Sequence, residues 1–160
     1  EDVKSLGVNF VVAGTDQRKI YMLGMEIGKE VGIPEAVYLY TPIIPGLRGP
    51  GGKMSSSVPE SLVSIRDKKE DIFRKVNKAY CVTGDVGNNP VLAIARLVIF
   101  PKFEKIEIKR DKKYGGNITF KDYSQLESSF ESGKIHPSDL KNAVAEYLEK
   151  IISPIRKAWK

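Results

Sequence analysis

The chain has 160 residues, of which 41% are hydrophobic and 29% are charged, and this is enough for one domain or two small ones. It lacks an apolar run near the roughly 20 residues of a membrane span and shows no signal peptide, and its single cysteine, Cys81, excludes an internal disulfide. One cysteine and one histidine argue against a zinc site, and a net charge of +6 suits a polyanionic partner such as nucleic acid. We therefore expect a cytoplasmic protein with no membrane contact and no protein-bound metal.

Residues 1–66 predict an α/β unit. Val8 to Gly14 is a short apolar run that indicates a buried strand, which the chain enters with no lead-in. Asp16 can cap the helix that follows, and Pro34 ends that helix. Ala36 to Tyr40 indicates a second strand, so the order strand, helix, strand predicts a βαβ unit with parallel strands. The expected apolar face of the helix consists of Ile20, Leu23, Ile27 and Val31.

The stretch from Pro42 to Ser57 is rich in proline and glycine and predicts a long loop. Loops of this length inside a compact domain are usually functional or disordered. A change in composition near Arg66 to Lys69 indicates a boundary, which divides the chain into residues 1–66 and 67–160.

Residues 67–160 predict a mainly helical domain. One amphipathic helix follows Lys68, and another begins at Asn89-Pro90 and ends at Pro101. Two short strands are expected around a turn at Gly115-Gly116, followed by a short helix and a long C-terminal helix from Pro137, which Pro154 should kink. The first helix carries a basic face that either binds nucleic-acid phosphates or is an ordinary solvated surface: Lys69, Arg74, Lys75 and Lys78.

The segment Gly51 to Ser57 contains residue types that can hold a nucleotide triphosphate. Glycines allow a ligand to approach the backbone closely, the Lys53 ammonium can neutralise a phosphate, and serine hydroxyls with successive amides can hold phosphate oxygens. The spacing of a P-loop is absent. On composition alone, a flexible surface loop explains the segment equally well.

Lys53-Met54-Ser55-Ser56-Ser57 resembles the Lys-Met-Ser-Lys-Ser signature of class I aminoacyl-tRNA synthetases. Further matches, in family order, are similar to segments of tyrosyl-tRNA synthetases of the archaeal and eukaryotic type. The chain therefore resembles the C-terminal part of such an enzyme, and its start at Glu1 suggests a piece of a longer protein. The matching segments are Asp16-Gln17-Arg18-Lys19, Lys78-Ala79-Tyr80-Cys81, Asn89-Pro90, Tyr114-Gly115-Gly116 and His136-Pro137-Ser138-Asp139-Leu140-Lys141.

The resemblance implies a fold and an activity. Residues 1–66 would be the C-terminal part of a Rossmann-type catalytic domain, and residues 67–160 a mainly helical anticodon-binding domain. The full enzyme, usually a homodimer, would activate L-tyrosine with ATP, accompanied by Mg²⁺, and transfer it from tyrosyl adenylate to tRNA(Tyr). The piece alone should be inactive, because the family's His-Ile-Gly-His-type signature and most of the tyrosine pocket belong N-terminal to it.

The resemblance also implies roles for single residues. Asp2 would hydrogen-bond the substrate phenol and Gln17 would contact tyrosine; the alternative for Asp2 is a frayed terminal residue. Lys53 would stabilise the pyrophosphate leaving group. His136 and Asp139 would read a guanine at the first anticodon position, with Tyr114 able to stack on it; otherwise His136 is only part of a helix cap. The implied ATP-binding and catalytic loop is Gly52, Lys53, Met54, Ser55, Ser56 and Ser57.

Ser56 stands where the general class I signature has lysine, so one positive charge is missing, as in the archaeal and eukaryotic relatives that the chain resembles. Two alternatives remain open. A tryptophanyl-tRNA synthetase relative is one alternative, although those enzymes usually have Asp-Gln-Asp where this chain has Asp16-Gln17-Arg18. A non-catalytic RNA-binding module on the same scaffold is the other.

Overall fold

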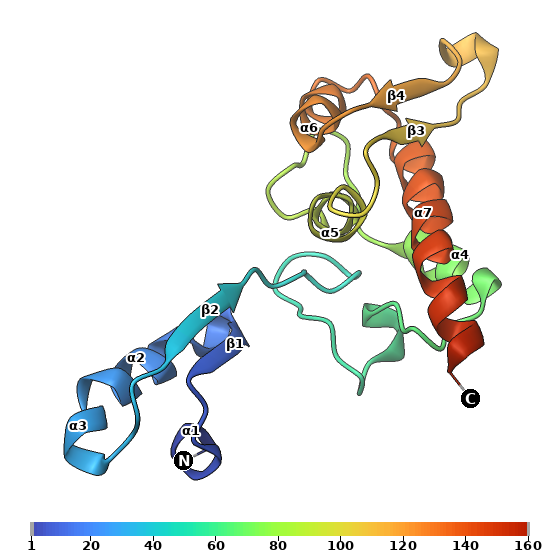
Figure 1. Cartoon of the computed structure of the whole chain (residues 1–160). Coiled ribbons are helices and arrows are strands. Elements are labelled where there is room, and N and C mark those ends of the chain that lie inside the picture. Colours follow the sequence, from blue (N-terminus) through green and yellow to red (C-terminus); the bar gives the residue numbers. More distant parts are fainter. Residues whose placement is uncertain (1, 160) are drawn as a thin grey trace. The chain divides into compact units, whose positions relative to one another are not determined.

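The computed structural model describes residues 2–159 and consists of two compact units, which divide between Ile43 and Ile44 (Figure 1). Unit 1 holds α1, β1, α2, α3 and β2, and unit 2 holds α4 to α7 with β3 and β4. No helix in residues 2–159 is long and apolar enough to cross a membrane.

Unit 1 contains the predicted βαβ arrangement. Its strands β1 (Phe10–Gly14) and β2 (Val37–Thr41) pair in parallel, with Phe10 opposite Val37 and Gly14 opposite Thr41. The helical connection between them is α2 (Arg18–Glu26) followed by α3 (Gly28–Val31). The sequence missed α1 (Asp2–Leu6), so the expectation that the chain enters the strand directly was wrong.

The helical connection differs from the single capped helix that we expected. Ile27 interrupts it with φ −93° and ψ 0°, between Gly24 and Gly28, two residues with low helix propensity. Asp16 does not cap the helix, because it lies in a 3₁₀ turn (Thr15–Gln17) and α2 starts after it. Gly32 ends α3 in the left-handed region at φ +68°.

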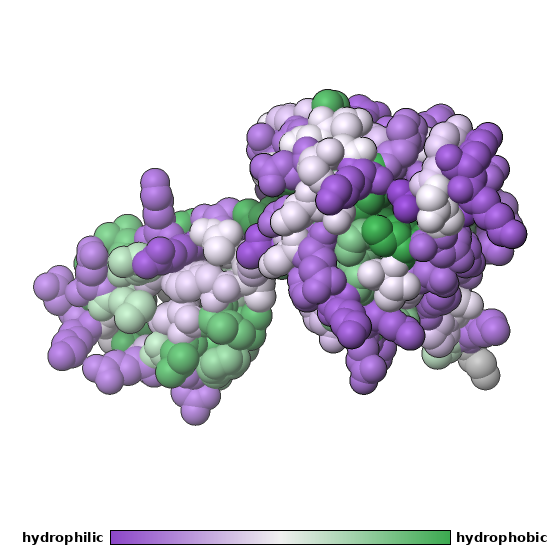
Figure 2. All heavy atoms as spheres, turned by 90° about the horizontal axis from the view of Figure 1, so that it is seen from above, coloured by the Kyte–Doolittle hydropathy of each residue, from purple (hydrophilic) through white to green (hydrophobic). Residues whose placement is uncertain are grey.

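The two faces of the unit 1 sheet differ in burial. Tyr38 and Tyr40 turn towards α2, where the Tyr21 ring lies 5.0 Å from Tyr38 and 6.5 Å from Tyr40 between centroids. The opposite face is apolar and open, and the face towards α2 is only half-buried, so the expectation of a buried strand was wrong. Hydrophobic side chains of unit 1 accordingly reach the surface in Figure 2. The open face consists of Phe10, Val12, Val37 and Leu39, exposed by 54%, 59%, 64% and 51%.

Unit 2 is mainly helical and confirms the predicted order of elements. Its helices are α4 (Lys69–Lys78), α5 (Pro90–Ile94) with a π-helical continuation to Ile99, α6 (Tyr123–Glu131) and α7 (Pro137–Ala158). The antiparallel strands β3 (Ile106–Ile108) and β4 (Ile118–Phe120) form the predicted hairpin. Pro154 lies inside α7, which continues beyond it.

The core of unit 2 lies between these elements. α7 packs along α4 and β3, which is visible in Figure 1. Asn89 starts α5 as its N-cap, since its side-chain oxygen accepts hydrogen bonds from the amides of Val91 (3.0 Å) and Leu92 (3.3 Å). The largest fully buried side chains include Ile72, Leu92, Ile99, Ile108, Leu126, Phe130 and Leu140.

The predicted division at residues 66 and 67 falls inside unit 2, not between the compact units. The segment from Ile44 onwards belongs to unit 2 because Leu47 is buried in its core with 1% exposure. The Leu47 amide donates to the Ser61 carbonyl at 2.9 Å, and its own carbonyl accepts from the Tyr80 amide at 2.7 Å. The functional assignment of residues 1–66 and 67–160 stays a prediction.

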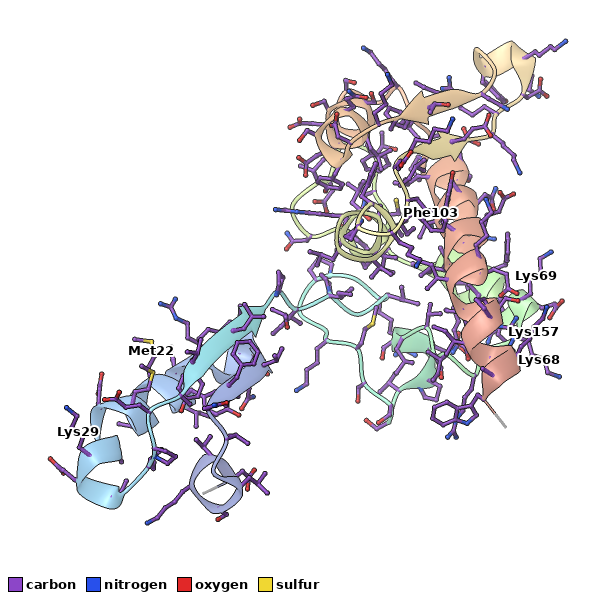
Figure 3. The ribbon with its side chains drawn as sticks, in the orientation of Figure 1. Met22, Lys29, Lys68, Lys69, Phe103 and Lys157 are labelled. Carbon is purple, nitrogen blue, oxygen red and sulfur yellow. The ribbon has the colours of Figure 1, made fainter. Side chains whose placement is uncertain are left out.

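The basic face of α4 is partly engaged within the protein. Lys75 is 6% exposed and pairs with Asp67 at 2.7 Å, and Arg74 pairs with Glu60 at 2.7 Å and with Asp71 at 3.2 Å. Figure 3 shows Lys68 and Lys69 at the start of α4 and Lys157 near the end of α7. Lys75 is therefore a structural residue and not a site for a nucleic-acid phosphate.

Candidate functional site

Asp2 and Gln17 lie on the same cavity of unit 1. Asp2 begins α1, and Gln17 ends the 3₁₀ turn before α2, where its side-chain amide donates to the Asp16 carboxylate at 3.1 Å. The cavity has a volume of about 250 Å³ and combines a carboxylate, an amide and aromatic walls. Such a combination can receive an aromatic ring that carries a hydroxyl. The lining residues are Asp2, Val3, Gln17, Ile20, Tyr21, Gly24, Ile33 and Tyr38.

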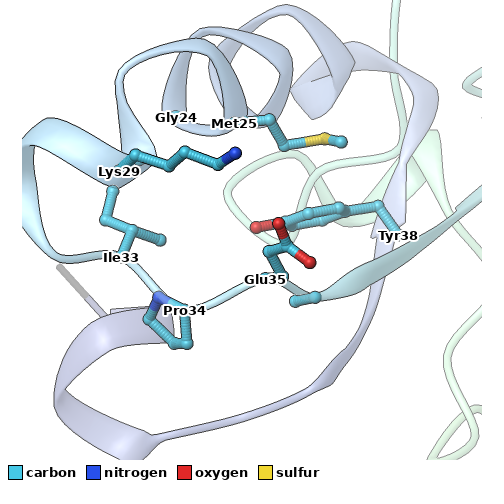
Figure 4. Close-up of a pocket in the computed structure, with 9 residues that line it drawn as sticks. Gly24, Met25, Lys29, Ile33, Pro34, Glu35 and Tyr38 are labelled. Atoms are coloured by element: carbon cyan, nitrogen blue, oxygen red, sulfur yellow. The ribbon is translucent and has the colours of Figure 1, made fainter.

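A neighbouring cavity of about 230 Å³ shares Gly24, Ile33 and Tyr38 with the first one. In the close-up of Figure 4, the Lys29 and Glu35 side chains extend over this cavity next to the Tyr38 ring. None of the site residues that we predicted from the sequence lines this second cavity. The hydroxyl of Tyr40, which lies on β2 together with Tyr38, is buried without a hydrogen-bond partner among residues 2–159.

Backbone contacts fix the shape of the predicted signature loop. The Gly46 amide donates to the Gly52 carbonyl at 2.9 Å, and Pro45 and Lys53 form an isolated antiparallel bridge. Gly49 requires glycine, because its φ is +103° and a Cβ there would lie 2.7 Å from the Tyr80 ring. The loop is therefore folded back on unit 2 by its own glycines.

Ser61, which the sequence analysis did not single out, anchors the far end of the loop. It is 5% exposed, and its hydroxyl donates to the Val58 carbonyl at 2.7 Å and accepts from the Ser55 amide at 3.1 Å. The Val58 amide in turn donates to the Ser55 carbonyl at 3.1 Å. A lone serine within a polar segment carries no sequence signal for such a role, since it depends on where the chain folds back.

The predicted phosphate-binding groups lie together between these anchors. Lys53 is exposed and has no carboxylate partner in residues 2–159, so its charge is free for a ligand. Met54 packs against the core of unit 2. The hydroxyls of Ser55 and Ser57 lie 2.7 Å apart, and Ser56 is exposed.

Tyr114, His136 and Asp139 line one cavity of about 480 Å³ in unit 2. Tyr114 closes the 3₁₀ turn after β3 and is 64% exposed, with the Lys113 ammonium 4.9 Å from its ring centroid. His136 is the N-cap of α7, and Asp139 lies in the first turn of that helix. Arg110 also lines the cavity and was missed in the sequence, where one arginine among many basic residues gives no signal.

The His136 ring has a defined orientation. Its Nδ1 accepts a hydrogen bond from the Ser138 amide at 3.2 Å, so a neutral ring carries its proton on Nε2. The cap role that the sequence left as an alternative is therefore real, and within residues 2–159 it leaves Nε2 without a hydrogen-bond partner and the residue exposed. Both the helix cap and a contact to a ligand can be made by the same residue.

Cys81 and Asp85 support the structure of unit 2. Burial raises the pKa of the Cys81 thiol, which packs on the core and accepts a hydrogen bond from the side-chain amide of Asn89 at 3.3 Å, so the residue is structural. The Tyr80 hydroxyl donates to Asp85 at 2.7 Å, and this bond lowers the pKa of the Asp85 carboxyl. Residues 2–159 contain no group of three or more metal-ligating side chains placed to hold an ion.

A comparison with known protein families identifies the fold and the lineage. The family model described as class I tRNA synthetases (W and Y) matches residues 1–153. The chain belongs to this synthetase family. Its α/β unit and helical unit therefore represent a class I tRNA synthetase fold.

Relatives of this synthetase chain include archaeal tyrosine–tRNA ligases. The Methanosarcina barkeri ligase is 46% identical over 98% of the chain and 48% of its own length, and the Saccharolobus islandicus ligase is 40% identical over the same shares. The chain thus spans about half the length of these relatives. Its place in the C-terminal part of the enzyme stays a prediction from the resemblance.

Solved structures agree with this assignment. The Archaeoglobus fulgidus tyrosyl-tRNA synthetase, complexed with L-tyrosine, has a TM-score of 0.86 and 46% identity over 98% of the synthetase chain and 48% of its own length. The Pyrococcus horikoshii enzyme, also complexed with L-tyrosine, has a TM-score of 0.87 and 32% identity over 99% and 50%. The Giardia lamblia tryptophanyl-tRNA synthetase, at 22% identity and a TM-score of 0.65, shows the shared fold alone.

Proposed function

We propose that this chain is the part of a tyrosine–tRNA ligase that supplies the signature loop, part of the tyrosine pocket and the anticodon-reading surface. The observation that carries the proposal is the 46% identity to a tyrosine–tRNA ligase along 98% of the chain, with an exposed Lys53 that has no carboxylate partner in residues 2–159. The identity to the tryptophanyl neighbour is 22%, which favours tyrosine over tryptophan.

The first reaction of such an enzyme forms tyrosyl adenylate. The tyrosine carboxylate attacks the α-phosphorus of ATP, and the bond to pyrophosphate breaks with negative charge moving to the leaving group. Lys53 would stabilise that charge, while the Ser55 to Ser57 hydroxyls and Gly52 hold phosphate oxygens. Mg²⁺ would enter with ATP and not through a site of this chain.

The substrate side chain would enter the cavity of Asp2 and Gln17. A carboxylate that accepts a hydrogen bond from the substrate phenol discriminates strongly against an amino acid without that hydroxyl, because the carboxylate would be left unpaired. The shared cavity supports Asp2 as a ligand and not as a frayed terminal residue. The rest of the pocket would come from the half of the synthetase that lies outside this chain.

The cavity of Tyr114, His136 and Asp139 would receive the first anticodon base. The exposed Tyr114 and His136 rings can stack on an unpaired base, and a carboxylate can accept from the N1–H and N2–H groups of guanine. We expect Asp139→Ala in the full-length enzyme to weaken aminoacylation and to spare adenylate formation. Equal losses in both reactions would contradict this role.

The decisive experiment measures amino-acid-dependent ATP–pyrophosphate exchange by the full-length synthetase that contains this chain. We expect Lys53→Ala to lower kcat by about 10²- to 10³-fold, or about 2.7–4 kcal/mol, with little change in the KM for tyrosine. Lys102→Ala, which removes an exposed lysine elsewhere in unit 2, is the matched control. The 160-residue chain alone should give no exchange.

The same experiment distinguishes the alternatives. Exchange that depends on tryptophan would replace tyrosine as the substrate, and a full-length protein without exchange for either amino acid would be an RNA-binding module. A Lys53→Ala variant that lost catalysis and tyrosine affinity equally would contradict the role given to the loop.

A further inference from the structure

Arg110 lines the cavity of Tyr114, His136 and Asp139, called the anticodon cavity from here on. One wall of this cavity is the turn that carries Tyr114 and the other is the start of α7 at His136. Arg110 forms hydrogen bonds to the chain beside both walls. Its Nε donates to the Gly116 carbonyl at 3.0 Å, next to the turn that carries Tyr114. Its Nη1 donates to the Lys134 carbonyl at 3.0 Å, two residues before His136. One half-buried guanidinium therefore joins two chain segments that are distant in sequence.

The two walls differ in how firmly they are held. Ile135, which precedes His136, is fully buried in the core, and the Lys134 amide donates to the Ser129 carbonyl at 2.9 Å. The Tyr114 turn stands at the tip of a short hairpin, where Gly115 and Gly116 have φ of +92° and +71°. A three-residue pairing with a glycine tip is weakly restrained by itself.

The planar fork of arginine is suited to this task. It presents several N–H groups in a fixed geometry, so that two carbonyl acceptors on different segments are held at a set separation. A lysine at the same position keeps the charge but offers a single flexible ammonium. Asn117 supports the arrangement, since its side-chain oxygen accepts from the Arg110 amide at 3.1 Å.

We propose that Arg110 is a positioning residue that sets the gap between Tyr114 and His136 to the thickness of one stacked base. The proposal rests on the anticodon function given above and adds the residue that shapes the site. Arg110 acts through the two walls, so its geometry and not its charge carries the effect. Substitution should therefore loosen binding and reduce the preference for guanine together.

The test uses the full-length synthetase that contains this chain and a fluorescent RNA hairpin with the anticodon loop of tRNA(Tyr), compared with a hairpin whose first anticodon base is adenine. We expect Arg110→Lys to raise the Kd for the guanine hairpin about tenfold and to bring the two hairpins within about twofold of each other. Arg110→Gln should behave in the same way. Circular dichroism and thermal unfolding identify any variant that fails to fold.

Lys109→Gln is the matched control, because it removes the neighbouring positive charge, which is 64% exposed and pairs with Glu146 at 3.0 Å. It should lower affinity for both hairpins equally and keep the preference for guanine. If Arg110→Lys binds like the parent, or changes both hairpins equally as Lys109→Gln does, the positioning role is wrong.

His136→Ala and Asp139→Ala separate this proposal from the one on which it rests. If both variants bind the hairpins like the parent, the cavity does not read the anticodon at all and both proposals fail. If both weaken binding while Arg110→Lys does not, the anticodon site stands and only the role of Arg110 is overturned.

Discussion

The two units of the chain differ in how much of their apolar surface is buried. Unit 2 has a core of its own, in which Ile72, Leu126 and Phe130 are completely buried. Unit 1 has one helix-covered sheet face and one open apolar face, and of residues 2–43 only Gly28 is buried. Parallel sheets are normally covered on both faces, and a two-stranded sheet is marginal alone. Unit 1 is therefore the unit without a buried core of its own, whereas the candidate sites of unit 2 lie on a packed core.

The largest expected effect tests this contrast directly. We expect Phe130→Ala in unit 2 to lower the free energy of unfolding of the chain by about 3–5 kcal/mol, because it leaves a cavity in a packed core. Phe10→Ala, on the open face of unit 1, should change it by less than about 0.5 kcal/mol. Urea unfolding followed by circular dichroism measures both. Similar losses would show that the open face is as well packed as the core.

Substitution of Ser61 should have an intermediate effect, and it tests whether the hydrogen bonds of unit 2 hold the signature loop in its shape. In the full-length enzyme, Ser61→Ala should remove the bonds to Ser55 and Val58 and lower kcat for pyrophosphate exchange by about 5- to 30-fold, or about 1–2 kcal/mol. Ser61→Thr keeps the hydroxyl and should recover most of the rate. Ser132→Ala, which removes a hydroxyl bonded at the end of α6, is the control. An unchanged rate in Ser61→Ala would mean that the loop holds its shape without this anchor.

The smallest expected effect is on the stability of unit 2 and comes from the hydrogen bond between Tyr80 and Asp85. The Tyr80 hydrogen bond, followed by the amides of Asn88 and Gly87, holds the pKa of Asp85 below its ordinary value of 3.8 in the folded chain. Because the depressed pKa belongs to the folded state, this stabilisation is present above pH 3.8 and is lost as the pH falls through the folded-state pKa. Tyr80→Phe keeps the ring against Gly49 but loses the bond.

The stability gap between Tyr80→Phe and the parent should therefore be largest near neutral pH and shrink in acid. Urea titrations at several values between neutral pH and pH 3 measure it. A gap that stays constant across that range would assign the effect of the substitution to packing and not to the ionised carboxylate.

Much of the fold could be predicted because its signals are local. Apolar runs and helical spacing gave β1, β2 and the helices of unit 2, and the glycines and prolines after Pro42 gave the loop. The boundary between the units could not be placed, since it depends on Leu47 reaching a core built from residues far along the chain. The open face of unit 1 likewise depends on tertiary contacts that a periodic pattern does not contain. The break at Ile27 is different, because the two glycines beside it, Gly24 and Gly28, are a local signal that the helical spacing outweighed.

The candidate sites divide in the same way. The resemblance pointed to three sets of residues, and each set lies on one loop or lines one cavity. The sets are Lys53 with the serines after it, Asp2 with Gln17, and His136 with Asp139. Ser61 and Arg110 were missed, because both act on backbone amides or carbonyls of other segments. Such acceptors and donors exist at every position, so that nothing in the sequence marks which of them a side chain will reach.

The anchored ends of the signature loop have an entropic consequence. The Gly46 bond to Gly52 on one side and the Ser61 bonds to Ser55 on the other leave little more than Lys53 and Met54 between fixed points. Ordering a residue costs about 1–2 kcal/mol of conformational free energy, and here that cost falls on two residues and not on the whole stretch from Pro42 to Ser57. A nucleotide that binds Lys53 would therefore lose little binding free energy to ordering the backbone of the loop. The movement of the Lys53 ammonium is limited to rotations of its own side chain.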